Sequence, residues 1–223
     1  MGKIISLAFR LWLRSQTDRL EHLEVKISGK NRQILTGYIP KVALAIEGAI
    51  YQGLHFTQGC IIGENIRINL GQVIKGKPLQ ILEPITARGE ILLAERDLQT
   101  SLNSPLLATA LKDFLFNLVP TQGDNNLEDW QINWQNIEIQ PQEIFLTGIL
   151  TTPDENATPL RLQAGLALLS PSQLRLFPLA IESSFLKQIP EEFHLDLGAE
   201  VQLEELNLST GQIFIKGGII VNP

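Results

Sequence analysis

The feature that most constrains the fold is an alternation of apolar and polar residues that recurs from about His22 to the C-terminus. In the first such segment Leu23, Val25 and Ile27 alternate with polar residues. Because successive side chains of a strand point to opposite faces, this pattern predicts half-exposed antiparallel strands rather than the continuous apolar runs of a buried parallel sheet. Similar segments occur at 42–46, 65–70, 130–139, 160–168, 174–176, 201–208 and 213–215.

Several local features refine this β-rich prediction. A turn at 28–31 leads into an apolar run that predicts a strand at 33–37, and a further strand is expected to begin at 79–81. The alternation slips by one residue at Gln135–Asn136, which indicates a β-bulge. A short sequence match between 34–37 and 145–148 suggests that the chain consists of two related halves. These would span 20–120 and 129–223, with the polar segment at 121–128 as the connector.

Helical spacing interrupts the strands between about Glu95 and Leu118. Ser104 and Pro105 are typical of a helix start, with a capping hydroxyl followed by a proline in the first turn. The apolar stripe that follows consists of Leu107, Leu111, Phe114, Leu115 and Leu118. We therefore expect an α+β fold in which a curved antiparallel sheet wraps around one long apolar helix. Four residues of the stripe are predicted to line a groove: Leu107, Leu111, Phe114 and Leu118.

Residues 1–19 predict an amphipathic helix preceding the single β-rich domain at 20–223. On a helix Lys3, Arg10 and Arg14 fall within about 40° of one another, and an apolar face that includes Ile5, Phe9 and Trp12 spreads over the opposite side. A helix lying in a membrane interface has this composition. A helix docked on the protein's own core would show a similar face. The absence of acidic residues before Asp18 favours the membrane.

The charge is distributed unevenly along the chain. Through Arg32 there are seven Lys and Arg against three Asp and Glu, a balance of +4, whereas the remainder carries 11 against 21, a balance of −10. A basic end on an acidic body is suited to an anionic partner. Arg10 interrupts the apolar run of residues 4–9 and no small-residue cleavage site follows, so the segment is expected to be retained in a cytoplasmic protein.

Composition and motifs exclude several other classes. The net charge of −6 argues against a protein that coats nucleic acid, and a single cysteine, Cys60, excludes a disulfide-stapled scaffold. No apolar run is long enough for a membrane-spanning helix. Phosphate-loop, dinucleotide, hydrolase and zinc-protease motifs are absent from the sequence. His22, His55 and His194 form no local metal motif, so neither a catalytic residue, a metal site nor a cofactor is predicted.

A set of spaced glycines and apolar residues, from about residue 20 onward, resembles the LmeA-like phospholipid-binding family, particularly its cyanobacterial branch. The matching segments are 35–37, 42–46, 49–54, 66–71, 77–79, 95–98 and 104–107. The resemblance implies a β-rich domain, related to the tubular lipid-binding folds, that binds phospholipid and performs no reaction on it. No residue-level site is implied by it.

Together these observations predict a non-enzymatic phospholipid-binding protein on the surface of anionic membranes, with acyl chains in an apolar groove. The membrane-contacting residues are predicted to be Lys3, Ile5, Phe9, Arg10, Trp12 and Arg14. The alternative is a protein-interaction module whose N-terminal helix docks on a partner protein.

Overall fold

The chain folds into two antiparallel sheets joined by helices. The computed structural model describes residues 2–118, 130–184 and 189–223. The six-stranded sheet has the order β1 (Arg19–Ser28), β2 (Tyr38–Tyr51), β3 (Leu54–Arg67), β4 (Ile85–Ala94), β11 (Gln212–Val221), β10 (Val201–Ser209). The five-stranded sheet has the order β5 (Gln131–Gln140), β6 (Glu143–Thr151), β7 (Ala157–Ser170), β8 (Gln173–Glu182), β9 (Phe193–Asp196). The β-rich, antiparallel prediction is confirmed, but two open sheets replace the single sheet expected.

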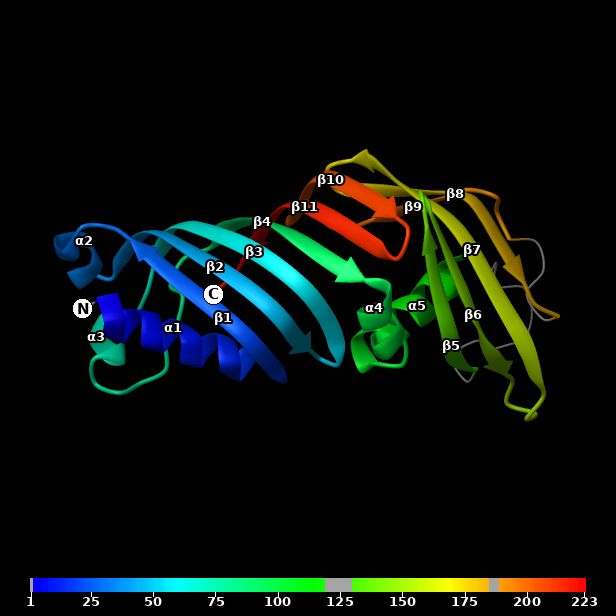
Figure 1. Cartoon of the computed structure of the whole chain (residues 1–223), viewed down its shortest axis with the longest axis horizontal. Coiled ribbons are helices and arrows are strands. Elements are labelled where there is room, and N and C mark those ends of the chain that lie inside the picture. The colour runs from blue at the N-terminus through cyan, green and yellow to red at the C-terminus, as the bar shows by residue number, and fades with distance from the viewer. Residues whose placement is uncertain (1, 119–129, 185–188) are drawn as a thin grey trace.

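The two sheets are not built from two consecutive halves of the chain. The C-terminal hairpin of β10 and β11 returns to the first sheet, where β11 pairs with β4 along its whole length. Figure 1 shows an elongated molecule, with the six-stranded sheet toward the end that carries the N-terminus and the five-stranded sheet toward the other end. The sequence match between 34–37 and 145–148 has no structural counterpart, because the first segment is helix and turn and the second lies in β6.

Five helices accompany the sheets in the described parts of the chain. They are α1 (Gly2–Gln16), α2 (Asn31–Leu35), α3 (Leu70–Val73), α4 (Glu95–Ser101) and α5 (Pro105–Leu118). Figure 1 places α1, α2 and α3 together at one end of the six-stranded sheet, and α4 and α5 between the two sheets. The N-terminal helix and the helical stretch near 95–118 are therefore where the sequence predicts them. The Ser104 hydroxyl accepts a hydrogen bond from the Leu107 backbone N–H at 3.3 Å, as expected of a cap.

Two predicted strands are wrong. The run at 33–37 forms α2 and the turn after it, because the Gln33 side chain accepts a hydrogen bond from the Lys30 N–H and closes a helical turn. Gly37, at φ +79°, reverses the chain there. Residues 79–81 make only an isolated bridge between Ile81 and Ile68, and β4 begins at Ile85. Pro78 and Pro84 flank this segment and lack the N–H that a longer ladder needs.

The predicted bulge at Gln135–Asn136 is confirmed, and α4 explains its stability. The pairing of β5 with β6 shifts register between Trp134 and Asn136. The Gln99 side-chain amide donates to the Gln135 carbonyl at 2.8 Å and accepts from the Ile137 N–H at 2.9 Å. One side chain of α4 therefore satisfies two backbone groups beside the bulge, which the regular ladder leaves without partners.

The hydrophobic core consists of two clusters at opposite ends of the six-stranded sheet. The smaller includes Val25, Val42 and Ile66, with Trp12 of α1 packed against it. The larger joins α4 and α5 to the five-stranded sheet and includes Leu102, Trp134 and Leu160. Between these clusters, the middle of one face of the six-stranded sheet is covered by fewer protein side chains than its two ends are.

Candidate lipid-binding trough and membrane-facing end

One face of the six-stranded sheet is apolar on every strand. The pairing register aligns Val25 with Leu44, Leu44 with Ile61, Ile61 with Gly89 and Gly89 with Gly217. Alternate residues of the same strands share this face, because side chains of a strand alternate between its two sides. The full set is Leu23, Val25, Ile27, Val42, Leu44, Ile46, Gly59, Ile61, Gly63, Ala87, Gly89, Ile91, Ile215, Gly217 and Ile219, with Val201 and Leu203 at the β10 edge.

The opposite face of the same sheet, here called the polar face, carries charged residues together with some apolar ones such as Ile62 and Ile220. Lys41 of β2 lies 3.5 Å from Glu64 of β3, and Lys216 of β11 lies 3.4 Å from Glu90 of β4. Such exposed ion pairs contribute little to stability, but they show that this face is suited to water. The sheet is therefore amphipathic, and its apolar face needs cover from protein or from a ligand.

The middle of the apolar face forms an open cavity of about 210 Å³, which we call the trough. Ile61, Ile91, Leu203 and Ile215 contribute partly exposed side chains to it, and Ile219 is 47% exposed. The trough lies between the two core clusters, at β3, β4, β11 and β10. Its lining offers apolar contact area and almost no hydrogen-bonding side chain, which favours a hydrocarbon ligand.

Glycines deepen the trough at its centre. Gly89 and Gly217 are paired across β4 and β11, so neither position places a side chain over the sheet. A methyl group at Gly89 would collide with the Cys60 carbonyl oxygen, and one at Gly217 would collide with that of Gln202. The close approach of neighbouring strands therefore requires glycine, and the resulting furrow has a backbone floor.

The predicted membrane-contacting residues of α1 differ in how far the structure exposes their side chains. Arg10 and Arg14 are exposed, whereas Trp12 is half-buried against the smaller core cluster. The side chains of Lys3, Ile5 and Phe9 lie outside the described part of the structure. Helix α1 thus contacts the core through Trp12 while it presents cations to solvent, and it combines features of both interpretations that the sequence left open.

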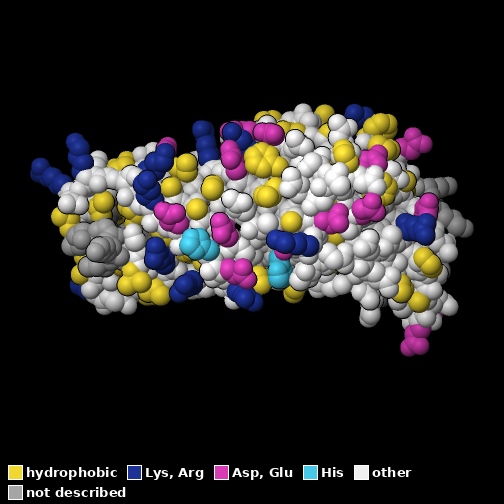
Figure 2. Space-filling model, in the orientation of Figure 1, with side chains coloured by type: hydrophobic (Ala, Val, Ile, Leu, Met, Phe, Trp, Pro, Cys, Tyr) yellow, Lys and Arg dark blue, Asp and Glu magenta, His cyan; other side chains and the backbone are white. Residues whose placement is uncertain are grey.

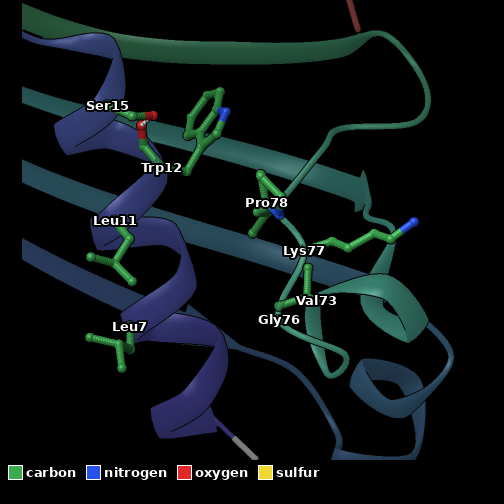
Figure 3. A pocket seen from close by; sticks show the side chains of 9 residues that line it. Leu7, Leu11, Trp12, Ser15, Val73, Gly76, Lys77 and Pro78 are labelled. Carbon is green, nitrogen blue, oxygen red and sulfur yellow. Dashed lines mark hydrogen bonds between the residues drawn. The ribbon is translucent and has the colours of Figure 1, made fainter.

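A second, larger cavity of about 460 Å³ opens between α1 and the segment at 73–79. Figure 3 shows Leu7, Leu11 and Trp12 on α1 and Val73 and Pro78 across the opening, with Trp12 extending toward the Pro78 side. Leu7 and Leu11 are 57% and 58% exposed, which is high for leucine side chains that line a cavity. Sequence reasoning missed both the segment at 73–79 and the two leucines as site residues, since only tertiary structure brings them together.

The four predicted groove residues of α5 lie against the larger core cluster. Leu107, Leu111 and Phe114 are partly buried there, and Phe114 contacts Phe193 edge to face with ring centroids 5.6 Å apart. Leu118 is only 3% exposed. The side chain of Leu118 is already covered by protein, whereas the other three retain some surface for a ligand.

The described residues do not bring together the metal ligands or the dyad that the sequence offered. They contain no group of three or more His, Cys, Asp or Glu that could hold a metal ion. Cys60 and His55 occupy positions of opposite parity on β3, so their side chains point to different faces and form no dyad. Trp130 and Trp134 are 8% and 2% exposed, and both pack in the core.

The resolved pKa shifts belong to an exposed cluster of Arg175 on β8, Glu192 just before β9 and His194 on β9. Arg175 donates two hydrogen bonds of 2.9 Å to the Glu192 carboxylate, which also lies 2.9 Å from the His194 ring. These hydrogen bonds, from Arg175 first and His194 second, lower the pKa of Glu192 to about 2, while the pKa of Arg175 is raised. The cluster explains how the short strand β9 is held to β8.

A pH dependence of β9 follows from the lowered pKa. Because the ionised Glu192 is favoured in the folded state, its contribution to stability is complete above its ordinary pKa near 4.5 and is lost as the pH falls toward 2. We expect the amides of residues 193–196 to lose protection, relative to their intrinsic exchange rates, in that window, and Glu192→Gln to show lower protection already at neutral pH. Hydrogen exchange measured by NMR checks this, and equal protection in the variant would contradict it.

Comparison with known proteins identifies the family of the chain. No helix in the described ranges is long and apolar enough to cross a bilayer. No curated protein and no solved structure matches the chain. A family model described as LmeA-like phospholipid-binding matches residues 2–218, which is nearly the whole chain. The chain therefore belongs to the LmeA-like phospholipid-binding family.

Proposed function

We propose that this protein binds phospholipid by covering acyl chains in the trough of the six-stranded sheet, while α1 holds it peripherally on an anionic membrane. The observation that carries the proposal is the apolar face, which continues across all six strands and lies open between two core clusters. Family membership supports phospholipid as the ligand class. Enclosure of lipid by a curved sheet would relate the fold to tubular lipid-binding proteins.

Burial of hydrocarbon would supply most of the affinity. Each methylene removed from water contributes about 0.8 kcal/mol before the cost of ordering the chain. The partly exposed side chains of Leu107, Leu111 and Phe114 offer further apolar surface at the end of the sheet near α5. No reaction is proposed, since binding requires only this surface.

The cations of α1 would bring the protein to the bilayer. A basic residue near an anionic surface contributes about 1 kcal/mol, and the cytoplasmic leaflet carries such a surface. Lys3, Arg10 and Arg14 would contact headgroup phosphates, with Ile5, Phe9 and Trp12 as the apolar residues of the helix. This supports peripheral association from the cytoplasmic side.

The proposal is tested by loading the protein with lipid. The full chain is incubated with vesicles of equal parts phosphatidylglycerol and phosphatidylcholine, separated from them, and assayed for lipid phosphorus. The expected result is phospholipid bound in simple stoichiometry. Recovery of protein without lipid, under conditions where the vesicles stay intact, would contradict the trough as a lipid site.

A further inference from the structure

The segment at 73–79, between α3 and β4, faces α1 across the larger cavity. Val73, Gly76, Lys77, Pro78 and Leu79 form one wall of that cavity, and residues of α1 form the other. Trp12 and Val73 also pack against the smaller core cluster, which contains Val25 and Val42 of the apolar sheet face. The cavity therefore opens at one end of the same face that holds the trough.

Both walls carry highly exposed apolar side chains at the rim. Ile74 is 58% exposed, close to the values of Leu7 and Leu11 on α1. Leu35, at the end of α2, is 52% exposed at the same end of the molecule. Large apolar residues that project in this way from neighbouring segments are typical of a surface that meets another apolar phase.

Cations on both walls have no carboxylate partner in the described parts of the chain. Arg10 and Arg14 on α1, and Lys75 and Lys77 on the opposite segment, are exposed and form no ion pair. Several cations on the sheets do pair with a glutamate, among them Lys41, Arg161, Arg175 and Lys216, whereas Lys26 and Arg88 have no ion pair in the described structure. Residues 70–82 contain two lysines and no acidic residue.

The surface view agrees with this distribution. Figure 2 shows Lys and Arg side chains beside hydrophobic ones at the end of the molecule that carries α2 and α3, whereas Asp and Glu on this face lie toward the middle and the opposite end. Unpaired positive charge around exposed apolar side chains is complementary to an anionic bilayer, which offers phosphates at its surface and hydrocarbon beneath.

We propose that the segment at 73–79 is a second membrane contact, and that it forms with α1 the two sides of an entrance through which a phospholipid of an anionic bilayer reaches the apolar sheet face. Ile74 enters the acyl boundary while Lys75 and Lys77 contact headgroups. One acyl chain lies in the cavity against Trp12, Val73 and Leu79. This inference rests on the proposed function and adds where the lipid enters.

The first test is co-sedimentation of the full chain with vesicles of equal parts phosphatidylglycerol and phosphatidylcholine. Ile74→Asp combined with Lys75→Glu and Lys77→Glu should weaken binding at least tenfold, although α1 is unchanged. Arg161→Glu with Lys216→Glu alters the net charge as much as the two lysine changes but lies on strands outside the lining of both cavities, and it should bind as the wild type does. If the variant with substitutions at 74, 75 and 77 binds the vesicles as strongly as the wild type does, the inference is overturned.

The second test follows Trp12 directly. Vesicles containing phosphatidylglycerol brominated on its acyl chains should quench tryptophan fluorescence in the wild type and much less in Trp12→Phe, because Trp130 and Trp134 are buried in the core. Equal quenching in both proteins would overturn the placement of the acyl chain. If the wild-type protein binds no vesicles at all, the proposed function itself fails. If the wild-type protein binds vesicles and the substitutions at 73–79 do not weaken that binding, only the present inference fails.

Discussion

Reversing the three cations of α1, by Lys3→Glu with Arg10→Glu and Arg14→Glu, is expected to abolish binding to anionic vesicles. Loss of three attractions of about 1 kcal/mol each weakens binding by a factor of about 100, and repulsion by the new carboxylates weakens it further. Arg10 and Arg14 are exposed and make no ion pair in the described structure, so stability should change little. Vesicle flotation measures the binding, and circular dichroism measures the fold.

The matched control reverses three cations elsewhere: Lys41, Arg161 and Lys216, on the polar side of the first sheet and on β7. This control has the same net charge as the α1 variant but keeps the basic helix. It should retain most of the binding. Equal loss in both proteins would show that total charge, rather than α1, governs the association.

The second large effect is expected from placing a charge in the trough. Ile61→Glu should reduce bound phospholipid to a small fraction of the wild-type level, because a carboxylate buried under an acyl chain would be left without a partner. Ile61 is only partly buried in the lipid-free protein, so the folded state tolerates the change better than a core position would. Lipid phosphorus per protein, after incubation with the mixed vesicles, provides the measurement.

Ile62→Glu is the control, since the next residue of β3 points to the polar face and is 38% exposed. The same substitution there should leave lipid loading unchanged. The inferred role of the trough fails if Ile61→Glu remains folded and loads as much phospholipid as Ile62→Glu. Vesicle binding through α1 should persist in both variants, which separates membrane association from lipid capture.

The local structure could be predicted where it depends on neighbouring residues. Alternation in the segments at 23–27 and 201–208 identified strands, the Ser104–Pro105 pair identified a helix start, and the slip at Gln135 identified a bulge. The failures have local causes as well. The run at 33–37 is apolar enough for a strand, but the hydrogen bond between Gln33 and Lys30 and the glycine at 37 favour a helical turn.

The arrangement of the sheets could not be predicted, because it depends on pairing between distant residues. Register brings Gly89 opposite Gly217, and no local pattern shows that the C-terminal hairpin joins β4 instead of the second sheet. The trough exists only because of that pairing. For the same reason the sequence placed the groove along Leu107, Leu111, Phe114 and Leu118, an apolar stripe that helical spacing shows without tertiary structure.

The exposure of the α1 side chains could be predicted only in part. The basic face of α1 could be recognised from helical spacing alone, and Arg10 and Arg14 are exposed as that pattern requires. The contact of Trp12 with the core could not be predicted, since the cluster that it packs against and the cavity that it lines are built from residues distant in the sequence. A helix that packs Trp12 against the core and exposes Arg10 and Arg14 has features of both interpretations that the sequence left open.

Lipid binding by the trough is tested most directly by native mass spectrometry of the gently purified wild-type protein, followed by organic extraction and identification of the released lipid. We expect a mass increase that corresponds to bound phospholipid, and its loss in Ile61→Glu but not in Ile62→Glu. A wild-type protein that carries no lipid, and gains none after incubation with anionic vesicles, would contradict the central claim that the apolar face of the six-stranded sheet binds acyl chains.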